Sequence, residues 1–330
     1  MSRSCCENDL TANSSRTRVR PLYFPLAILV LSCFVGNASA QTAEQLVDQF
    51  SPENLIQESL EESQEGGLPP FRASDFVVGD LEGTGQPDFI IAAYTNGFSA
   101  AVRVLKKQGG TFVLADQSHV DWLTGIFPSV RLLDLDGDKK PEIIASFSGP
   151  RGAVADWVFR WNGNSLELIS PQPFDADGRL FIALVDSLFV DLDRDGKLEV
   201  ISARQVDDEL VNDVFGFDNL GHLQFRKSLN YFRTYYRHAE KPNPITRAFI
   251  TNRTELPYVV KILNGDPSGQ NRVSSAEVSL NGVTIAGPNR FSQQVSEINV
   301  PVALQQPNEI TVELGGAPGS QITVVVELQQ

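Results

Sequence analysis

Cysteine is scarce in this sequence. The 330 residues include only three, Cys5, Cys6 and Cys33, and all of them lie within the first forty positions. If these forty positions are cleaved off, the mature chain has no cysteine and no disulfide can stabilise it. A bound metal ion is then the expected substitute.

The apolar run over residues 22–35 is too short to cross a bilayer, which requires roughly 20 apolar residues. Arginines precede this run and Ala38-Ser39-Ala40 follows it, which predicts a signal peptide over residues 1–40, cleaved before Gln41. The alternative is a lipoprotein anchored through Cys33, which ends a weak lipobox. Both interpretations predict an exported protein, whether secreted, periplasmic or at the cell surface, with no transmembrane span in the mature chain.

Positive charge is in short supply. Lys and Arg number 27 against 41 Asp and Glu, a net charge of −14, and loss of the leader makes the balance more negative still. This balance argues against nucleic acid and anionic membrane surfaces as partners. The mature chain, of about 290 residues, is long enough for two domains with their own cores.

Catalytic motifs are lacking as well. His119, His222 and His238 are the only histidines and none stands in an H-E-x-x-H pattern; G-x-S-x-G is absent, and the mature chain has no cysteine nucleophile. A Ser-His-Asp site can still assemble from scattered residues. The sequence therefore leaves enzymatic activity undecided and favours a non-enzymatic role.

Residues 41–70 predict a short helical leader. Leu46, Val47 and Phe50 recur at helical spacing among acidic residues, and a Gly- and Pro-rich stretch at residues 66–70 ends the pattern. We expect this leader to pack against the segment that comes after it in the chain.

An acidic loop recurs three times between residues 71 and 243. The copies begin at Asp80, Asp134 and Asp191, at spacings of 54 and 57 residues. In each copy an apolar stretch precedes the loop, a strand-like run follows it, and a hairpin-type turn comes about 30 residues after the first Asp. Four short strands per copy is the content of a propeller blade.

The third loop, residues 191–199, places carboxylates at its positions 1, 3, 5 and 9. So many carboxylates in one turn repel one another unless a cation neutralises them, and Ca²⁺ prefers six to eight oxygen ligands at about 2.3–2.6 Å. The second loop, residues 134–142, repeats the pattern, with Lys139 where a glycine would ease the turn. The first loop, residues 80–88, has Glu82 and Thr84 in place of two aspartates and is expected to bind most weakly.

The loops do not fit an EF-hand. Their position 12 holds Ile91, Ala145 and Ser202 instead of a carboxylate, and strand-like residues follow where a helix would be needed. Any one loop could be an ordinary solvated acidic turn, but three copies in phase favour a structural calcium ion.

The three copies resemble the FG-GAP or VCBS repeats of bacterial secreted proteins and integrin α chains, whose loop pattern is D-x-[DN]-x-D-G-x-x-D. The resemblance implies integrin-like β-propeller blades, each with a calcium ion in the loop between its first two strands, and so up to three Ca²⁺ ions. The ligands it implies are Asp80, Glu82, Thr84, Asp88, Asp134, Asp136, Asp138, Glu142, Asp191, Asp193, Asp195 and Glu199. Closed propellers typically have four to eight blades, so an unclosed stack of three must have its edges covered or paired.

Residues 244–330 carry no acidic loop. Short strand-like runs alternate apolar and polar residues, and Asn281-Gly282 between two of them predicts a two-residue hairpin. This part resembles the small β-sandwich modules at the ends of bacterial secreted repeat proteins. The aromatic and basic stretch at residues 231–238 suits either sugar stacking or partner contact or, as we favour, a final strand or linker packed against the sandwich. Trp122, Trp157 and Trp161 are expected in the blade core.

The sequence thus predicts an all-β protein: signal peptide 1–40, helical leader 41–70, three blade-type repeats over 71–243 and a β-sandwich over 244–330. We expect a calcium-binding module that binds or scaffolds a glycan or an extracellular or envelope protein without catalysis. The alternatives are a polysaccharide-active lyase or hydrolase on a propeller-like scaffold, and a purely structural envelope protein. Fold alone does not choose among them, and the sequence does not indicate the oligomeric state.

Overall fold

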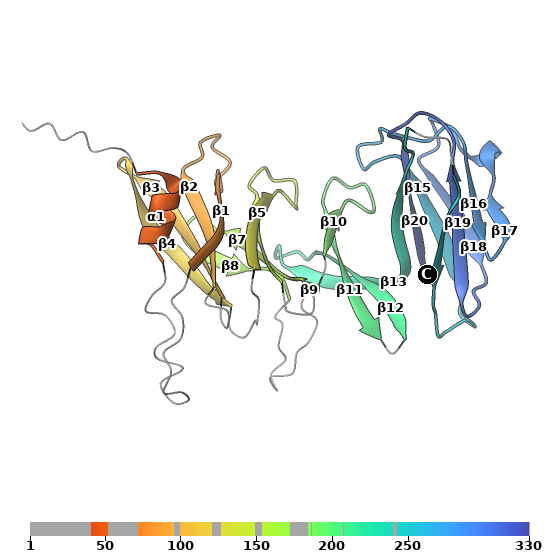
Figure 1. The fold of residues 1–330 in the computed structure, drawn as a ribbon, viewed down its shortest axis with the longest axis horizontal. Helices are drawn as coiled ribbons and strands as arrows, with labels where there is room; N and C mark the ends of the chain where they lie inside the picture. The colour runs from red at the N-terminus through yellow and green to blue at the C-terminus, as the bar shows by residue number, and fades with distance from the viewer. Residues whose placement is uncertain are drawn as a thin grey trace, which may run out of the picture. The chain divides into compact units, whose positions relative to one another are not determined.

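The computed structural model describes residues 41–51, 72–95, 100–120, 127–148, 154–171, 184–185, 187–206, 208–239 and 243–329 (Figure 1). The predicted signal peptide, Cys33, most of the leader after residue 51 and Trp122 lie outside these residues. The described part is all-β, with antiparallel sheets, one α-helix and one 3-10 turn (Pro288–Arg290). It contains no helix that is long and apolar enough to cross a membrane.

Helix α1 (Ala43–Gln49) forms the described part of the predicted leader. Its N-terminus is a capping box: Gln45 donates its backbone N–H to the Thr42 hydroxyl, and the Gln45 side chain accepts from the Thr42 N–H. Leu46 and Val47 are buried against the first sheet, and the Tyr94 hydroxyl donates to the Val47 carbonyl at 2.8 Å.

Three sheets of the repeat region follow one another along the chain, and in each the acidic loop joins the first two strands. The first repeat sheet contains β1 (Arg72–Gly79), β2 (Phe89–Thr95), β3 (Ala100–Gln108) and β4 (Thr111–Val120). The second contains β5 (Phe127–Leu133), β6 (Glu142–Ser148), β7 (Val154–Trp161) and β8 (Leu166–Leu168), with β9 (Leu184–Val185) paired to β7. The third contains β10 (Leu188–Val190), β11 (Glu199–Val206), β12 (Glu209–Phe217) and β13 (Leu223–Tyr236).

These sheets bury both of their faces, so their inner strands read as continuous apolar runs. On β2, Phe89 and Ile91 pack into a core shared with the second repeat sheet, whereas Ile90 and Tyr94 point the other way, against α1. Trp157 and Trp161 lie in the shared core, as expected. A further core joins the second sheet to the third, and another joins the third to the C-terminal strands.

Strand β13 joins the third repeat sheet to the C-terminal strands within one seven-stranded sheet. Its first half pairs with β12 and its second half with β20 (Gln321–Leu328), so the third repeat sheet continues into the C-terminal part in the order β10-β11-β12-β13-β20-β15-β18. Residues 231–236 of the aromatic stretch are therefore a strand, one of the two forms expected from the sequence, with Tyr231 and Tyr235 buried and Tyr236 exposed. Together with α1, this junction covers the outer faces that three unclosed sheets would leave open.

The C-terminal unit, residues 243–329, has two sheets around one core. One consists of β20, β15 (Tyr258–Asn264) and β18 (Glu297–Val302); the other of β14 (Ile245–Phe249), β19 (Asn308–Leu314), β16 (Ala276–Leu280) and β17 (Val283–Ala286). Asn281 and Gly282 join β16 to β17 with φ angles of 51° and 78°, which is the predicted hairpin.

Candidate metal centre

Each acidic loop turns through two left-handed residues, at its positions 4 and 6. Position 4 has φ of 69° at Gly83, 78° at Gly137 and 66° at Arg194. Position 6 is also left-handed, and there Lys139 has φ of 70° where the other two loops have glycine. A side chain in this region costs about 1–2 kcal/mol, so the second and third loops each carry one strained residue.

The first Asp of each loop holds the turn through backbone amides. The Asp134 carboxylate accepts from Gly137 at 2.8 Å and Lys139 at 3.0 Å, and Asp191 accepts from Asp195 and Gly196, both at 3.1 Å. In the first loop, burial raises the pKa of Asp80, but the amides that point at it outweigh this and leave the pKa below its usual value. The aspartate at position 1 is thus needed to hold the turn, with or without a metal ion.

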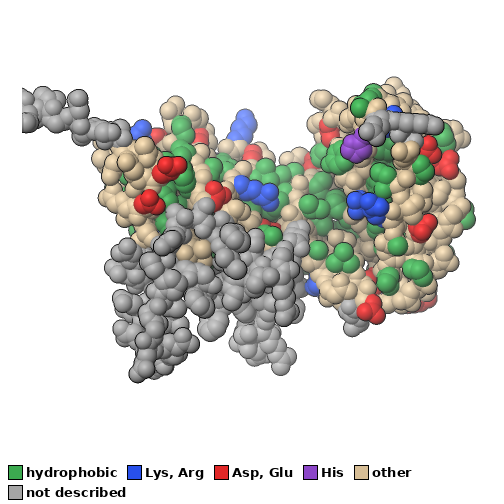
Figure 2. Space-filling view, in the orientation of Figure 1, with side chains coloured by type: hydrophobic (Ala, Val, Ile, Leu, Met, Phe, Trp, Pro, Cys, Tyr) green, Lys and Arg blue, Asp and Glu red, His purple; other side chains and the backbone are tan. Residues whose placement is uncertain are grey.

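Carboxylates converge in the second and third loops. Asp134, Asp136 and Glu142 each offer an oxygen within 4.8 Å of the others, and the third loop does the same through the residues at its positions 1, 3 and 9: Asp191, Asp193 and Glu199. Two oxygens on one calcium ion lie at most about 5 Å apart, so both groups match calcium in size. On the face drawn in Figure 2 the acidic side chains are scattered, and this convergence occurs within the loops.

The position-5 aspartates lie outside these two groups. Asp138 accepts the N–H of Lys140 at 2.7 Å, and Asp195 accepts the N–H of Lys197 at 2.8 Å. In the first loop, Thr84 lies 3.4 Å from an Asp80 oxygen, and Asp80, Glu82 and Asp88 form no such convergent group among the described residues.

The glutamate at position 9 is fixed by the backbone of its own loop. Glu142 Oε2 accepts the N–H of Leu135 at 2.9 Å, and Glu199 Oε2 accepts the N–H of Leu192 at 2.7 Å. Both leucines are buried in the cores, so they anchor the loops to the sheets. Each glutamate also offers one oxygen to the convergent group of its loop.

Of the three loops, the third has the strongest repulsion among its carboxylates. Burial, with added repulsion from Asp193, Asp195 and Asp191, raises the pKa of Glu199 to about 7. Asp191 is only 7% exposed. Within the described part of the chain, no Lys, Arg or His nitrogen lies within 4.0 Å of these carboxylates, whose repulsion a divalent cation would relieve. The third loop therefore fits calcium.

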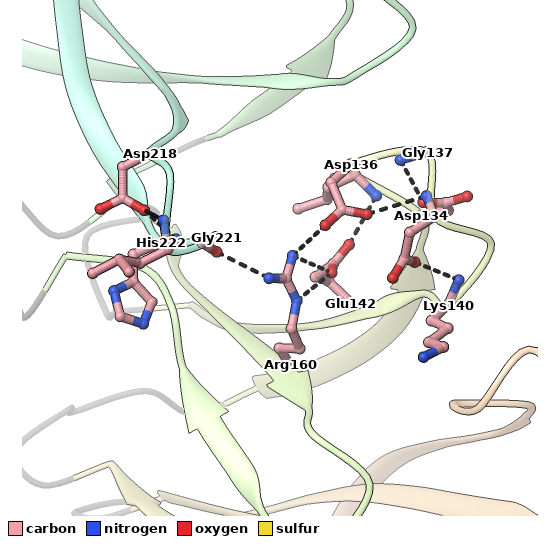
Figure 3. Close-up of polar contacts among 12 residues, drawn as sticks. Asp134, Asp136, Gly137, Lys140, Glu142, Arg160, Asp218, Gly221 and His222 are labelled. Carbon is pink, nitrogen blue, oxygen red and sulfur yellow. Dashed lines mark hydrogen bonds and ion pairs between the residues drawn. The ribbon is translucent and has the colours of Figure 1, made fainter.

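The second loop already holds a cation from the protein itself (Figure 3). Arg160 Nη2 lies 2.6 Å from Asp136 Oδ2 and 2.9 Å from Glu142 Oε1, and its Nε lies 3.0 Å from the same Glu142 oxygen. Burial raises the pKa of Glu142 even so, because Glu142 is only 2% exposed.

The first loop is neutralised by a lysine. Lys106 Nζ lies 2.6 Å from Glu82 Oε1, and Trp161 Nε1 donates to the same oxygen at 3.3 Å. The hydrogen bond from Lys106 holds the pKa of Glu82 below its usual range. Neither Lys106 nor Arg160 was expected at a site from the sequence, although each stands 26 residues after the first Asp of its loop.

Two cavities adjoin the loops. The larger, of about 300 Å³, lies between β10, the third loop and the C-terminal unit, and its lining includes Leu188, Asp191, Arg194, Phe232 and Tyr236. The smaller, of about 200 Å³, lies between the first and second loops beside Trp161 and Arg160.

Comparison with known proteins gives a family match for one segment of the chain, residues 80–145. No curated protein matches it. Among solved structures, a fructofuranosidase from Schwanniomyces occidentalis complexed with fructosylnystose is 10% identical, with 81% of this chain and 72% of that chain covered and a TM-score of 0.21. A second structure, of beta-fructofuranosidase from the same organism complexed with fructosyl-erythritol, is 9% identical, with coverage of 79% and 70% and a TM-score of 0.22. TM-scores this low carry no argument about fold or activity.

The family model described as FG-GAP-like repeat matches residues 80–145, so this segment, with the first two acidic loops, contains an FG-GAP-like repeat.

Proposed function

We propose that this chain is an exported, calcium-stabilised repeat protein that binds or scaffolds a glycan or an extracellular or envelope protein without catalysing a reaction. The observation that carries the proposal is the third loop, in which Asp191, Asp193 and Glu199 converge without a cation from the described residues. Calcium bound there would neutralise these carboxylates and hold the loop in its folded form.

In this proposal the three repeat sheets are propeller-type blades and the C-terminal unit is a β-sandwich module. Four antiparallel strands with the acidic loop after the first strand support the former. The two sheets that share one core in residues 243–329 support the latter.

The partner surface is the 300 Å³ cavity beside the third loop. Leu188 and Tyr236 are 53% and 52% exposed there, and Arg194 and Thr234 supply hydrogen-bonding groups. An exposed aromatic ring beside such groups suits the apolar face and hydroxyls of a sugar ring or the side chain of a protein partner. The polysaccharide-active alternative has no observation of its own in its favour.

Two measurements test the proposal. Thermal unfolding of the protein in calcium and in chelator is expected to show a higher midpoint with calcium, since a ligand that binds only the folded state stabilises it by about 2.7 kcal/mol at a hundredfold excess over Kd. The calcium-loaded protein is then screened on glycan and envelope-protein panels, with Tyr236→Ala as the variant that loses binding and Leu220→Ala, an exposed residue outside the cavity lining, as the matched control. No calcium shift would contradict the metal role, and no binding on either panel would contradict the partner role.

A further inference from the structure

Arg160 occupies the place that a metal ion would take in the second loop. It contacts two of the three convergent carboxylates, Asp136 and Glu142, through Nε and Nη2 (Figure 3). With Leu135 on the other oxygen, both oxygens of Glu142 are already engaged. A calcium ion here would have to displace a charge-assisted, nearly buried pair.

The guanidinium is itself held from the far side. Arg160 Nη1 donates to the carbonyl of Gly221 at 3.2 Å, and the guanidinium carbon lies 5.4 Å from the centre of the Phe217 ring. Both partners belong to the third repeat, so Arg160 also fastens the second loop to its neighbour. Moving it aside would break these contacts as well as the ion pairs.

The register counterpart of Arg160 in the first repeat is Lys107, whose Nζ lies 3.9 Å from an Asp88 oxygen. The cation at position 3 of the first loop is instead Lys106, one residue earlier on β3. It pairs with Glu82 and lies 5.2 Å from the centre of the Phe89 ring, while Trp161 of the second repeat donates to the same Glu82 oxygen. The glutamate at position 3, which departs from the aspartate of the other loops, provides the reach for this pair.

The third loop has glycine where the second has arginine. Phe159 pairs with Ile143 on β6, and Phe215 pairs with Val200 on β11; Ile143 and Val200 both lie nine residues after the first Asp of their loops. Gly216 therefore follows Phe215 as Arg160 follows Phe159. A glycine cannot supply a cation.

We infer that Arg160 and Lys106 are resident cations that exclude calcium from the second and first loops, so that the chain binds a single calcium ion, in the third loop. The inference rests on the proposed calcium role of that loop. It departs from the three ions that the resemblance implies. Whether a loop takes calcium is decided by a residue on the strand beside it, outside the loop itself.

The test is the number of calcium ions bound, measured by isothermal titration of the metal-free protein with calcium. The protein as it stands is expected to bind one ion. Arg160→Gln is expected to bind two, because it frees Asp136 and Glu142, and Gly216→Arg is expected to bind none. A Cβ at residue 216 would lie 3.2 Å from Arg226 Nε, and its three nearest atoms all belong to the flexible side chain of Arg226. Arg204→Gln, which removes an arginine that pairs with Asp213 away from the loops, is the matched control and keeps one ion.

Substitutions inside the loops give the same answer if Arg160→Gln fails to fold. The double variant Asp134→Asn with Asp136→Asn is expected to keep one ion, and Asp191→Asn with Asp193→Asn is expected to bind none. Two or three ions on the unmodified protein would overturn the resident-cation inference and leave the proposed calcium role standing. No ion at all would overturn both.

Discussion

Leu198 donates its backbone N–H to the carbonyl of Leu135 at 2.7 Å, which joins the third acidic loop directly to the second. The third loop is also tied on its other side, because Arg194 Nη2 donates to the carbonyl of Asn264 in the C-terminal unit at 3.0 Å. The loop that best fits calcium is therefore a connection between the repeats and the C-terminal unit. A metal ion that stiffens it should act beyond the loop.

Calcium is accordingly expected to slow hydrogen exchange at the amide of Leu198 as well as at the amides of Asp195 and Gly196, because local opening of the third loop must break all three hydrogen bonds. Hydrogen exchange with mass spectrometry, in calcium and in chelator, measures this. The variant Asp191→Asn with Asp193→Asn is the control and should show no calcium effect. Protection confined to residues 191–197 would contradict coupling between the loops.

The left-handed residue at position 6 of the second loop predicts a stabilising substitution. Lys139 has φ of 70°, whereas the first and third loops have glycine at the same position, with φ of 80° at Gly85 and 91° at Gly196. Lys139→Gly is expected to raise the free energy of unfolding by about 0.5–1 kcal/mol, because relief of the left-handed strain exceeds the entropy that glycine adds to the unfolded chain. Denaturant unfolding measures it. Lys140→Gly, next in the chain and without a positive φ, is expected to be neutral or destabilising. An equal rise in the free energy of unfolding for Lys140→Gly would contradict the explanation by left-handed strain.

Much of the β architecture could be predicted because it depends on local signals. Alternation and turn residues predict six C-terminal strands, over residues 258–263, 276–280, 283–285, 298–304, 310–314 and 322–328, and each prediction lies within two residues of the observed ends of β15 to β20. The phase of the acidic loops predicts the turns of the repeats. Strand β14, short and largely exposed, was missed.

The features that escaped prediction depend on tertiary contacts. Nothing in the sequence of β13 indicates that its second half pairs with β20, a strand about 90 residues later. Arg160 and Lys106 read as ordinary strand residues until the register places them beside the loops. The convergence of positions 1, 3 and 9 without position 5 likewise depends on where each side chain points. The spacing of residues in the sequence does not indicate these side-chain directions.

Helix α1 is expected to stabilise the first repeat sheet although it has only 7 residues. Leu46→Ala should lower the free energy of unfolding by about 2 kcal/mol, because it leaves a gap over Ile90 and Tyr94. Denaturant unfolding is again the measurement, with Asp48→Ala on the exposed side of the same helix as the control that changes little. Equal effects of the two substitutions would mean that α1 does not contribute by packing.

The raised pKa of Glu199 predicts how the free energy of unfolding depends on pH. Calcium is expected to reverse the sign of that dependence. The pKa is about 7 in the folded protein against 4.5 ordinarily, so between these values the folded state binds more protons than the unfolded state. In chelator, the contribution of Glu199 to the free energy of unfolding is therefore fully present below about pH 4.5 and is lost as the pH rises to about 7. Glu199→Gln should remove this loss, so the variant gains stability relative to the unmodified protein between pH 5 and pH 8. Glu313→Gln, an exposed glutamate on β19, is the control and should follow the unmodified protein.

In calcium the relative stability of Glu199→Gln and the unmodified protein is expected to change, because the ion requires the ionised carboxylate of Glu199. The stabilisation by calcium is expected to be larger at pH 8 than at pH 5 and to be weakened by Glu199→Gln at both. Denaturant unfolding of the three proteins at the two pH values, with and without calcium, separates the effects. If Glu199→Gln followed the unmodified protein in chelator, burial of this carboxylate would not carry the strain that makes the third loop a calcium site; if it also kept the full calcium effect, the ion would have to bind through other oxygens.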